Sequence, residues 1–243
     1  MSLSDTFRDL GWGDGLLYLL SEGLRRISKD GIRLIKYYLV AQPVKPSLEV
    51  PAHRGRDIKV REILAGDPLL GLIAHPPSVI ESRFAQQAHC LLATRHQALA
   101  GYLWYVIGNY REDEVRCWFI PQPEDRAVWD FDVYVAPELR LSATFTRLWD
   151  AAYQQLYAQG YRFSCSRISA FKSTSLAAHR RLGARIVGRG LFLCIGSWQL
   201  TLAAPDTRWS LSIREQSVPR IPVFAEPAPR GSNDPQSRNG RAR

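Results

Sequence analysis

Hydrophobic and polar positions alternate in several short runs along the first two thirds of the chain. These runs are rich in aromatic and β-branched residues, a pattern typical of β-strands. They cover residues 32–40, 58–63, 89–94, 99–107, 115–120 and 128–135. The last of them, VWDFDVYV, is the clearest strand in the sequence, and residues 115–120 are expected to extend the hairpin formed by the two runs before them.

The first segment of the chain has helical periodicity instead. Over residues 6–29, Leu17, Leu20, Leu24 and Ile27 fall on one stripe, and the basic residues near the end of the segment lie off it. We expect this stripe to pack against the sheet, because a strand follows at once. The alternative is a basic amphipathic helix that lies on a membrane surface.

Helical and strand patterns alternate in the second half. Helices are predicted over residues 142–158 and 173–182, strands over 162–168, 186–195 and 198–202, and an earlier helix over 79–87. Short connections between such elements favour a mixed α/β (α+β) sheet flanked by helices over a helical bundle or a sandwich.

Three regions follow from these patterns. Residues 1–31 form an N-terminal amphipathic helix, residues 32–202 the main domain, and residues 203–243 a basic tail rich in proline and arginine. The tail is expected to be disordered, since it has too few apolar residues to fold alone. Trp209, Leu211, Ile213, Ile221 and Val223 are the tail residues that could touch the domain.

The composition of the chain indicates which kinds of partner it can bind and which kinds of site it lacks. The formal net charge of +9 fits a polyanionic partner, such as nucleic acid, an anionic membrane, a phosphorylated cofactor or an acidic carrier protein. The four cysteines are dispersed and form no metal-ligand spacing, so we expect buried thiols, no bound metal and no disulfide framework. Acidic residues precede the first apolar stretch, which predicts no signal peptide and a cytoplasmic protein.

The turn after the clearest strand carries candidate chemistry. Asp132 to Arg140 leads into a predicted helix, and a helix N-terminus with free N–H groups favours phosphate. The segment resembles the coenzyme-binding turn of the GNAT N-acetyltransferase superfamily, with Arg140 at the opening basic position of Gln/Arg-x-x-Gly-x-Gly/Ala. Ala143 and Phe145 stand at the two small positions, and Ser142 is the expected N-cap. The resemblance implies a GNAT-like, mostly antiparallel sheet that binds acyl-coenzyme A through Val133, Val135, Arg140, Ser142 and Ala143.

A second segment carries the same resemblance. Residues 169–184 are similar to the closing GNAT motif, Asn-x-x-Ser/Ala-x-x-x-Tyr-x-Lys-x-Gly-Phe, with matches at Ser175, Arg181 and Gly183. Lys172 and Arg181 are then expected near the coenzyme phosphates, with Ser175 beside them. His179 replaces the family's tyrosine and becomes the candidate general acid for the departing thiolate; the alternative is a surface histidine on a basic helix.

The acceptor needs a general base. Strand alternation places Asp130, Asp132 and Tyr134 on one face of the clearest strand, and family members often carry the base on this strand. Asp130 is the preferred candidate, and Glu81 in the earlier helix is another. The alternative for both is ordinary charge pairing with nearby arginines.

These features predict an acyltransferase that moves an acyl group, typically acetyl, from acyl-coenzyme A to an amine or hydroxyl. The acceptor could be a polysaccharide-precursor sugar, an amino acid or a protein lysine, and the donor could instead be an acyl-carrier protein. A different reading is a catalytically silent GNAT-like module that binds a partner or a regulatory thioester. Nucleic-acid binding through the tail is the weaker third alternative, since no known nucleic-acid motif is present.

Overall fold

The computed structural model describes residues 3–51, 53–204, 208–213 and 218–226. Its helices are α1 (Leu3–Ile27), α2 (Pro77–Ala85), α3 (Thr144–Ala158) and α4 (Ser173–Arg181), with short 3-10 helices at Pro68–Leu72 and Pro137–Leu139. The strands are β1 (Ile32–Pro43), β2 (Ile58–Ile63), β3 (His89–Arg95), β4 (Ala98–Val106), β5 (Tyr110–Arg111), β6 (Trp118–Gln122), β7 (Ala127–Val135), β8 (Phe163–Ser169), β9 (Arg185–Ile195), β10 (Trp198–Ala204), β11 (Arg208–Ser212) and β12 (Arg220–Phe224).

Nine of these strands form one sheet in the order β11-β10-β9-β1-β8-β7-β4-β3-β2. Every neighbouring pair in it is antiparallel except β7 and β8, which are parallel. The predicted fold class, a mixed and mostly antiparallel sheet flanked by helices, is therefore confirmed.

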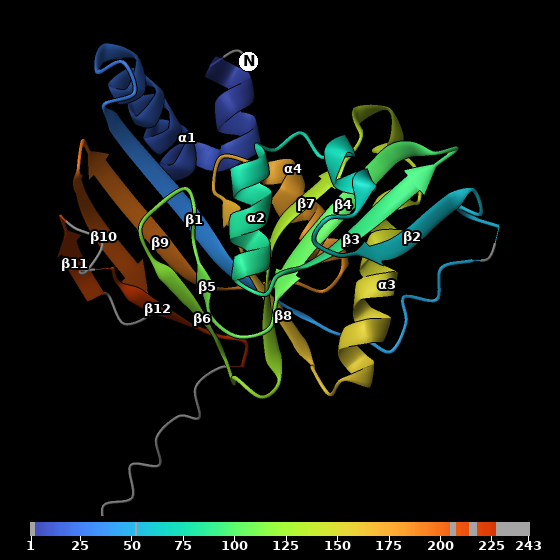
Figure 1. Cartoon of the computed structure of the whole chain (residues 1–243). Helices are drawn as coiled ribbons and strands as arrows, with labels where there is room; N and C mark the ends of the chain where they lie inside the picture. The colour runs from blue at the N-terminus through green and yellow to red at the C-terminus, as the bar shows by residue number, and fades with distance from the viewer. Residues whose placement is uncertain (1–2, 52, 205–207, 214–217, 227–243) are drawn as a thin grey trace, which may run out of the picture.

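Helices cover both faces of the large sheet (Figure 1). One face carries α2 together with a small sheet of β12, β6 and β5, and its core contains Trp104, Trp129 and Phe119. The opposite face carries α3, which buries Leu148 and Trp149 against β3, β4 and β7. The helices α1 and α4 lie on that second face, where α4 packs beside Val40 and Ile168.

Two sequence-based expectations about strands are wrong. Residues 115–120 do not extend the β3–β4 hairpin; Trp118–Gln122 pairs with β5 and, in parallel, with β12. The tail predicted to be disordered contains β11 and β12, because their apolar residues find partners: Leu211 lies opposite Leu200, and Ile221 opposite Phe119. The rest of the predicted tail, residues 227–243, lies outside the described residues.

The expected packing stripe of α1 is only half right. Leu17 and Leu24 are half-buried, but Leu20 and Ile27 are exposed, and polar groups of α1 also bind the sheet. Asp14 binds Lys36, with Oδ1 and Nζ 2.5 Å apart, and Ser21 Oγ donates to the carbonyl of Leu34. Hydrogen bonds to β1 thus help to orient this helix, and Leu20 and Ile27 of the predicted stripe face away from the sheet.

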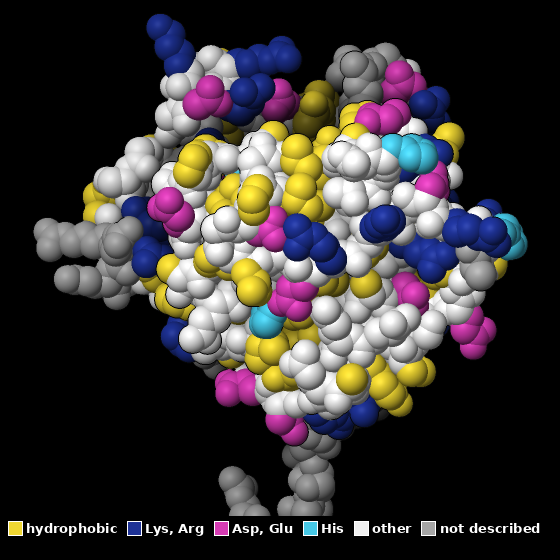
Figure 2. Space-filling view, turned by 45° about the vertical axis from the view of Figure 1, so that its right-hand side comes forward, with side chains coloured by type: hydrophobic (Ala, Val, Ile, Leu, Met, Phe, Trp, Pro, Cys, Tyr) yellow, Lys and Arg dark blue, Asp and Glu magenta, His cyan; other side chains and the backbone are white. Residues whose placement is uncertain are grey.

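Charge is distributed rather than gathered on the face seen in Figure 2. Basic side chains there stand beside acidic and hydrophobic ones. Near the edge strand β2, cations are paired with carboxylates, since Arg61 binds Asp67 and Arg95 binds Asp57. This face therefore presents no single positive field of the kind that nucleic-acid binding requires.

Gly101 fixes the approach of β4 to β7 and α3. A Cβ at this position would lie 2.4 Å from the carbonyl oxygen of Tyr134 and 3.1 Å from Leu148 Cδ1. We expect Gly101→Ala to lower the free energy of unfolding by about 2–3 kcal/mol, because backbone must shift to admit the methyl group. Urea denaturation measures this. Gly71→Ala is the matched control, since nothing lies within 4 Å of its Cβ position; equal losses in both variants would contradict the packing argument.

Candidate active site

The strand β7 changes its surroundings halfway along its length. It pairs with β8 from Ala127 to Asp130, where Asp130 lies opposite Ser166, and then continues to Val135 with β4 as its neighbour. Its first five residues are buried and its last four are half-buried. Among the described residues, no strand pairs with the edge of β7 that faces β8 beyond Asp130, and this edge can accept another extended chain.

A β-bulge lies at the same place. Trp104 is opposite Asp132 and Tyr105 is opposite Asp130, so Phe131 is an extra residue in β7. The extra residue reverses the alternation. Asp130 faces α3, and Asp132 faces α2 with Trp104. The expectation that Asp130 and Asp132 share a face is therefore wrong, because the pattern of alternation assumes a regular strand.

Asp130 is the last residue of β7 paired with β8, and its side chain is buried. Ser164 Oγ donates to its Oδ2 at 2.7 Å. Burial raises the pKa of Asp130 from 3.8 to about 7, although the hydrogen bond from Ser164 favours the ionised form. A carboxyl with this pKa can exchange protons near neutrality, but its side chain lies inside the α3 face.

Asp132 lies at the centre of a polar cluster on the α2 face. Its Oδ2 accepts a hydrogen bond from Arg83 and lies 2.8 Å from His75 Nε2. Tyr102 Oη is 3.2 Å from the same nitrogen, and the Tyr102 ring stacks on Tyr134. A carboxylate only accepts hydrogen bonds, so Nε2 of His75 carries a proton in this contact. In the neutral tautomer of such a ring, Nδ1 is the nitrogen with the lone pair.

His75 also lines a cavity of about 530 Å³. Most of its walls are apolar, and they include Ile73, Ile80 and Phe84. Glu81 lies at this cavity on the exposed side of α2. The cavity therefore offers one imidazole and one carboxylate in otherwise apolar surroundings.

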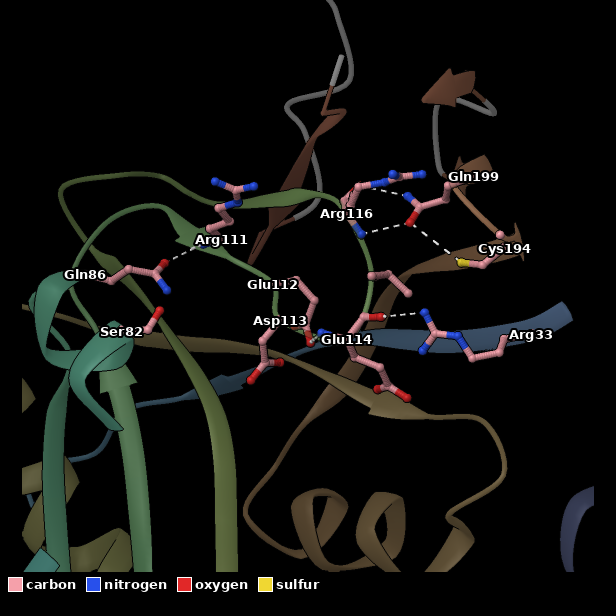
Figure 3. A pocket seen from close by; sticks show the side chains of 12 residues that line it. Arg33, Ser82, Gln86, Arg111, Glu112, Asp113, Glu114, Arg116, Cys194 and Gln199 are labelled. Carbon is pink, nitrogen blue, oxygen red and sulfur yellow. Dashed lines mark hydrogen bonds between the residues drawn. The ribbon is translucent and has the colours of Figure 1, made fainter. Parts of the chain in front are cut away.

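A second cavity, of about 480 Å³, is charged (Figure 3). It lies between α2, the segment that joins β5 to β6, and strands β1, β9 and β10; Asp113 and Glu114 line it with Arg33, Arg111 and Arg116. Glu112 forms a bidentate pair with Arg167 of β8, at 2.5 and 2.8 Å. Arg167 also lies 3.7 Å from Glu114 and 4.0 Å from Asp113. This network connects β8 to the α2 face, where Asp132 lies.

The turn between β7 and α3 is glycine-free and exposed. Arg140 and Leu141 point to solvent, and α3 begins at Thr144 with Ala143 as its N-cap, which makes no side-chain cap. The expectation that Ser142 is the N-cap is wrong by one residue, because Ser142 precedes the N-cap Ala143. Its Oγ still accepts a hydrogen bond from the Thr144 N–H at 3.2 Å. The first turn of α3 therefore retains donors for an anion.

Residues 54–56 lie over this turn, which the sequence did not indicate. A Cβ on Gly55 would be 3.0 Å from the Cβ of Ala143. Arg147 of α3 donates to the carbonyl of Arg54 at 2.8 Å and fixes this loop. The exposed Arg54 and Arg56 flank Gly55, so they add two cations near the start of α3.

The second predicted motif folds into α4. Lys172 is its exposed N-cap, Arg181 is exposed at its end, and Ser175 is half-buried. His179 is buried, and its ring contacts Phe145 and Trp149 edge-on. Its Nδ1 lies 3.0 Å from Gln42 Oε1, and burial lowers the pKa of His179 to about 4.

The three predicted catalytic residues are therefore not brought together. Asp130 is buried on the α3 face, His179 lies between α3 and α4, and Glu81 is on α2 at the other face. Of the predicted coenzyme residues, Val133, Val135, Arg140, Ser142 and Ala143 follow one another around the end of β7 and the start of α3, whereas Lys172, Ser175 and Arg181 belong to α4. His75 was missed, because no local pattern connects it to Asp132, 57 residues later.

The four cysteines are buried and free, as predicted. Burial raises the pKa of the Cys90 and Cys117 thiols, which makes both poor nucleophiles. Within the described residues, no group of three or more His, Cys, Asp or Glu is placed to hold a metal ion. None of the described helices is long and apolar enough to cross a membrane.

No family model and no curated protein sequence matches the chain. Its structure is similar to solved structures at low sequence identity. A functionally unknown conserved protein from Staphylococcus epidermidis is 13% identical with a TM-score of 0.48; the match covers 70% of this chain and 65% of that one. A GCN5-related N-acetyltransferase from Sphaerobacter thermophilus is 16% identical with a TM-score of 0.44, over 70% of this chain and 54% of that one.

An aminoglycoside acetyltransferase from an uncultured soil metagenomic sample is 12% identical with a TM-score of 0.39, and the match covers 52% of this chain and 88% of that one. Acetyltransferases of the family that the sequence resembles are thus among the similar structures. The chain spans about two thirds of the staphylococcal protein and about half of the Sphaerobacter protein. At these identities and TM-scores the likeness concerns the arrangement of helices and strands.

Proposed function

We propose that this protein is an acyltransferase that moves an acyl group from acyl-coenzyme A to an amine, with His75 as the general base. The observation that carries the proposal is the bulge in β7. It turns Asp132 toward His75 at the point where β7 loses its pairing with β8. A base held by a carboxylate thus lies beside an unpaired strand edge.

The donor would bind along that edge. The arm of coenzyme A carries amide groups, and an extended chain of amides can pair with free backbone groups as an added strand does. Its diphosphate would then reach the first turn of α3, where helix N–H groups favour an anion. Arg140, Arg54 and Arg56 supply cations there, and Lys172 and Arg181 of α4 supply two more.

The chemistry needs little beyond placement and one base. Nδ1 of His75 takes a proton from the attacking amine as nitrogen forms its bond to the thioester carbon. The carbon–sulfur bond then breaks and the thiolate leaves. The thiolate takes the proton from His75, which returns to its neutral form. Asp132 holds the imidazole in position and stabilises its positive charge while it carries the proton.

The acceptor would enter from the cavity that His75 lines. Its apolar walls suit the carbon skeleton of an amine, and Glu81 suits an ammonium group. We therefore infer an amine on a largely apolar body as the acceptor class. Of the two acceptor groups expected from the sequence, an amine or a hydroxyl, this selects the amine.

Arg140→Glu tests the donor site. Calorimetry with acetyl-, succinyl- and long-chain acyl-coenzyme A is expected to show binding to the natural chain and an affinity about tenfold lower for the variant, since a charge-assisted phosphate contact is replaced by repulsion. Arg220→Glu, an exposed charge reversal on β12, is the matched control and should bind normally. Absence of binding to all three thioesters would contradict the coenzyme assignment.

A second candidate function has its own observation. Phe145 occupies a position where small residues are usual in the family, and it packs against Trp149 and His179. A turn filled in this way would suit a module that binds an acyl thioester without turnover. Release of free thiol from acetyl-coenzyme A in the presence of a panel of primary amines distinguishes the two: the enzyme releases thiol, and the silent module binds without releasing it.

A further inference from the structure

The outward side of α1 is apolar. Beyond the kink at Gly11, Trp12, Leu16, Leu20 and Ile27 fall within one stripe of the helix, and the exposed fractions of Trp12 and Ile27 are 75% and 88%. The inward side is mixed: Asp14 and Ser21 bind β1, and Tyr18 packs edge-on against Phe171. A helix of a soluble domain normally keeps its outward side polar.

The sheet beside α1 continues this surface. Leu34 of β1 lies opposite Leu193, Leu193 opposite Leu200, and Leu200 opposite Leu211, so this row and its neighbours share one face. The exposed members of this face are Ile195, Trp198, Leu202, Trp209 and Leu211. Since Lys36 in the next row binds Asp14 of α1, the helix stripe and these strand residues lie on the same side of the molecule. We call the nine exposed residues the apolar side.

Cations border the apolar side. Arg26 and Lys29 are exposed at the end of α1, and Arg189 is exposed on β9, where its guanidinium lies 5.7 Å from the Tyr38 ring centre. Among the described residues no ion pair joins these three to a carboxylate. The nearby acidic groups are Glu22 and Asp30, which share Arg25, and Asp14, which pairs with Lys36. Five cations, counting Arg25 and Lys36, thus face three carboxylates, and the border has a net charge of +2.

We propose that the apolar side binds the surface of an anionic lipid membrane. Tryptophan and leucine at the acyl boundary with arginine and lysine at the headgroups is the composition that interfacial helices use. The charge argues against a second copy as the occupant. A two-fold dimer would bring the same net-positive patch of both copies together, and like charges repel.

Flotation of the full-length chain with lipid vesicles tests this assignment. We expect binding to vesicles of phosphatidylcholine mixed with phosphatidylglycerol, and weaker binding to phosphatidylcholine alone. The double variant Leu16→Gln/Leu20→Gln should lower the partition coefficient about tenfold or more. The reason is that two apolar side chains no longer insert at the acyl boundary of the membrane. Leu64→Gln is the control, since Leu64 is 70% exposed in the turn after β2, away from the apolar side.

A second variant tests the charge independently. Arg26→Glu/Lys29→Glu should lower binding to the anionic vesicles about tenfold at low salt and leave binding to neutral vesicles unchanged. Circular dichroism checks that each variant keeps the fold, which is expected because all four positions are exposed. Equal flotation of natural and variant chains would overturn the proposal. So would a concentration-dependent dimer, seen by analytical ultracentrifugation, that the two leucine substitutions abolish.

Discussion

Replacement of His75 by glutamine is expected to lower kcat/KM for acyl transfer about 10²–10⁴-fold, the usual contribution of a positioned general base. The physical reason is that Nδ1 carries the lone pair that accepts the proton, while Nε2 of the same ring is hydrogen-bonded to Asp132. A base acts in its deprotonated form, so the natural rate falls toward low pH. The variant should lose this fall, and steady-state thiol release across the pH range measures both effects.

His89 provides a matched control for this prediction. It is also half-buried, and its Nδ1 lies 2.6 Å from Glu62, but its ring stacks on Tyr105, away from the bulge. His89→Gln should keep the rate and its pH dependence. Added imidazole should partly restore His75→Ala, since it can occupy the space of the missing ring. A rate that is unchanged in His75→Gln, or one that is lost equally in both glutamine variants, would remove the assigned base.

Asp130→Asn is expected to change how stability depends on pH. The pKa of Asp130 rises from 3.8 to about 7 on folding, so the folded chain holds an extra proton between these values. Its contribution to the free energy of unfolding is fully present below about pH 4 and is lost as the pH rises through about 7, which amounts to about 4 kcal/mol. Asparagine cannot ionise, so the variant should not undergo this loss.

Urea denaturation at about pH 4 and about pH 8 measures the difference between the two chains. Relative to the natural chain, the variant should gain stability toward high pH. Asp67→Asn is the contrasting control, because Arg61 holds the pKa of Asp67 below its usual range. Removal of the Asp67 charge should therefore lower the stability of that variant toward high pH, relative to the natural chain. Parallel stability profiles for natural chain and Asp130→Asn would show that this carboxyl ionises freely in the folded state.

Much of the fold was predictable from local sequence. The alternation in β7 and the four-residue spacing in α3 are each set by neighbours within a few residues, and both elements occur where they were expected. The end of α4 at Leu182 and Gly183 was predictable for the same reason, since Gly183 adopts a positive φ of 94° there. The turn at Arg140, where we propose that the coenzyme binds, also follows from one continuous segment.

The site itself depends on features that local patterns do not contain. Whether β7 is regular or bulged at Phe131 is decided by its register with β4, and that register determines which aspartate meets His75. The side of α1 that faces the sheet is decided by Asp14 and Lys36 rather than by its leucines. The sequence alone determined the elements and the region of the donor turn, because those depend on short-range periodicity. Only the tertiary structure decided the contact of His75 with Asp132 and the exposed apolar side, because strand register and long-range hydrogen bonds select one face from two that the sequence leaves equivalent.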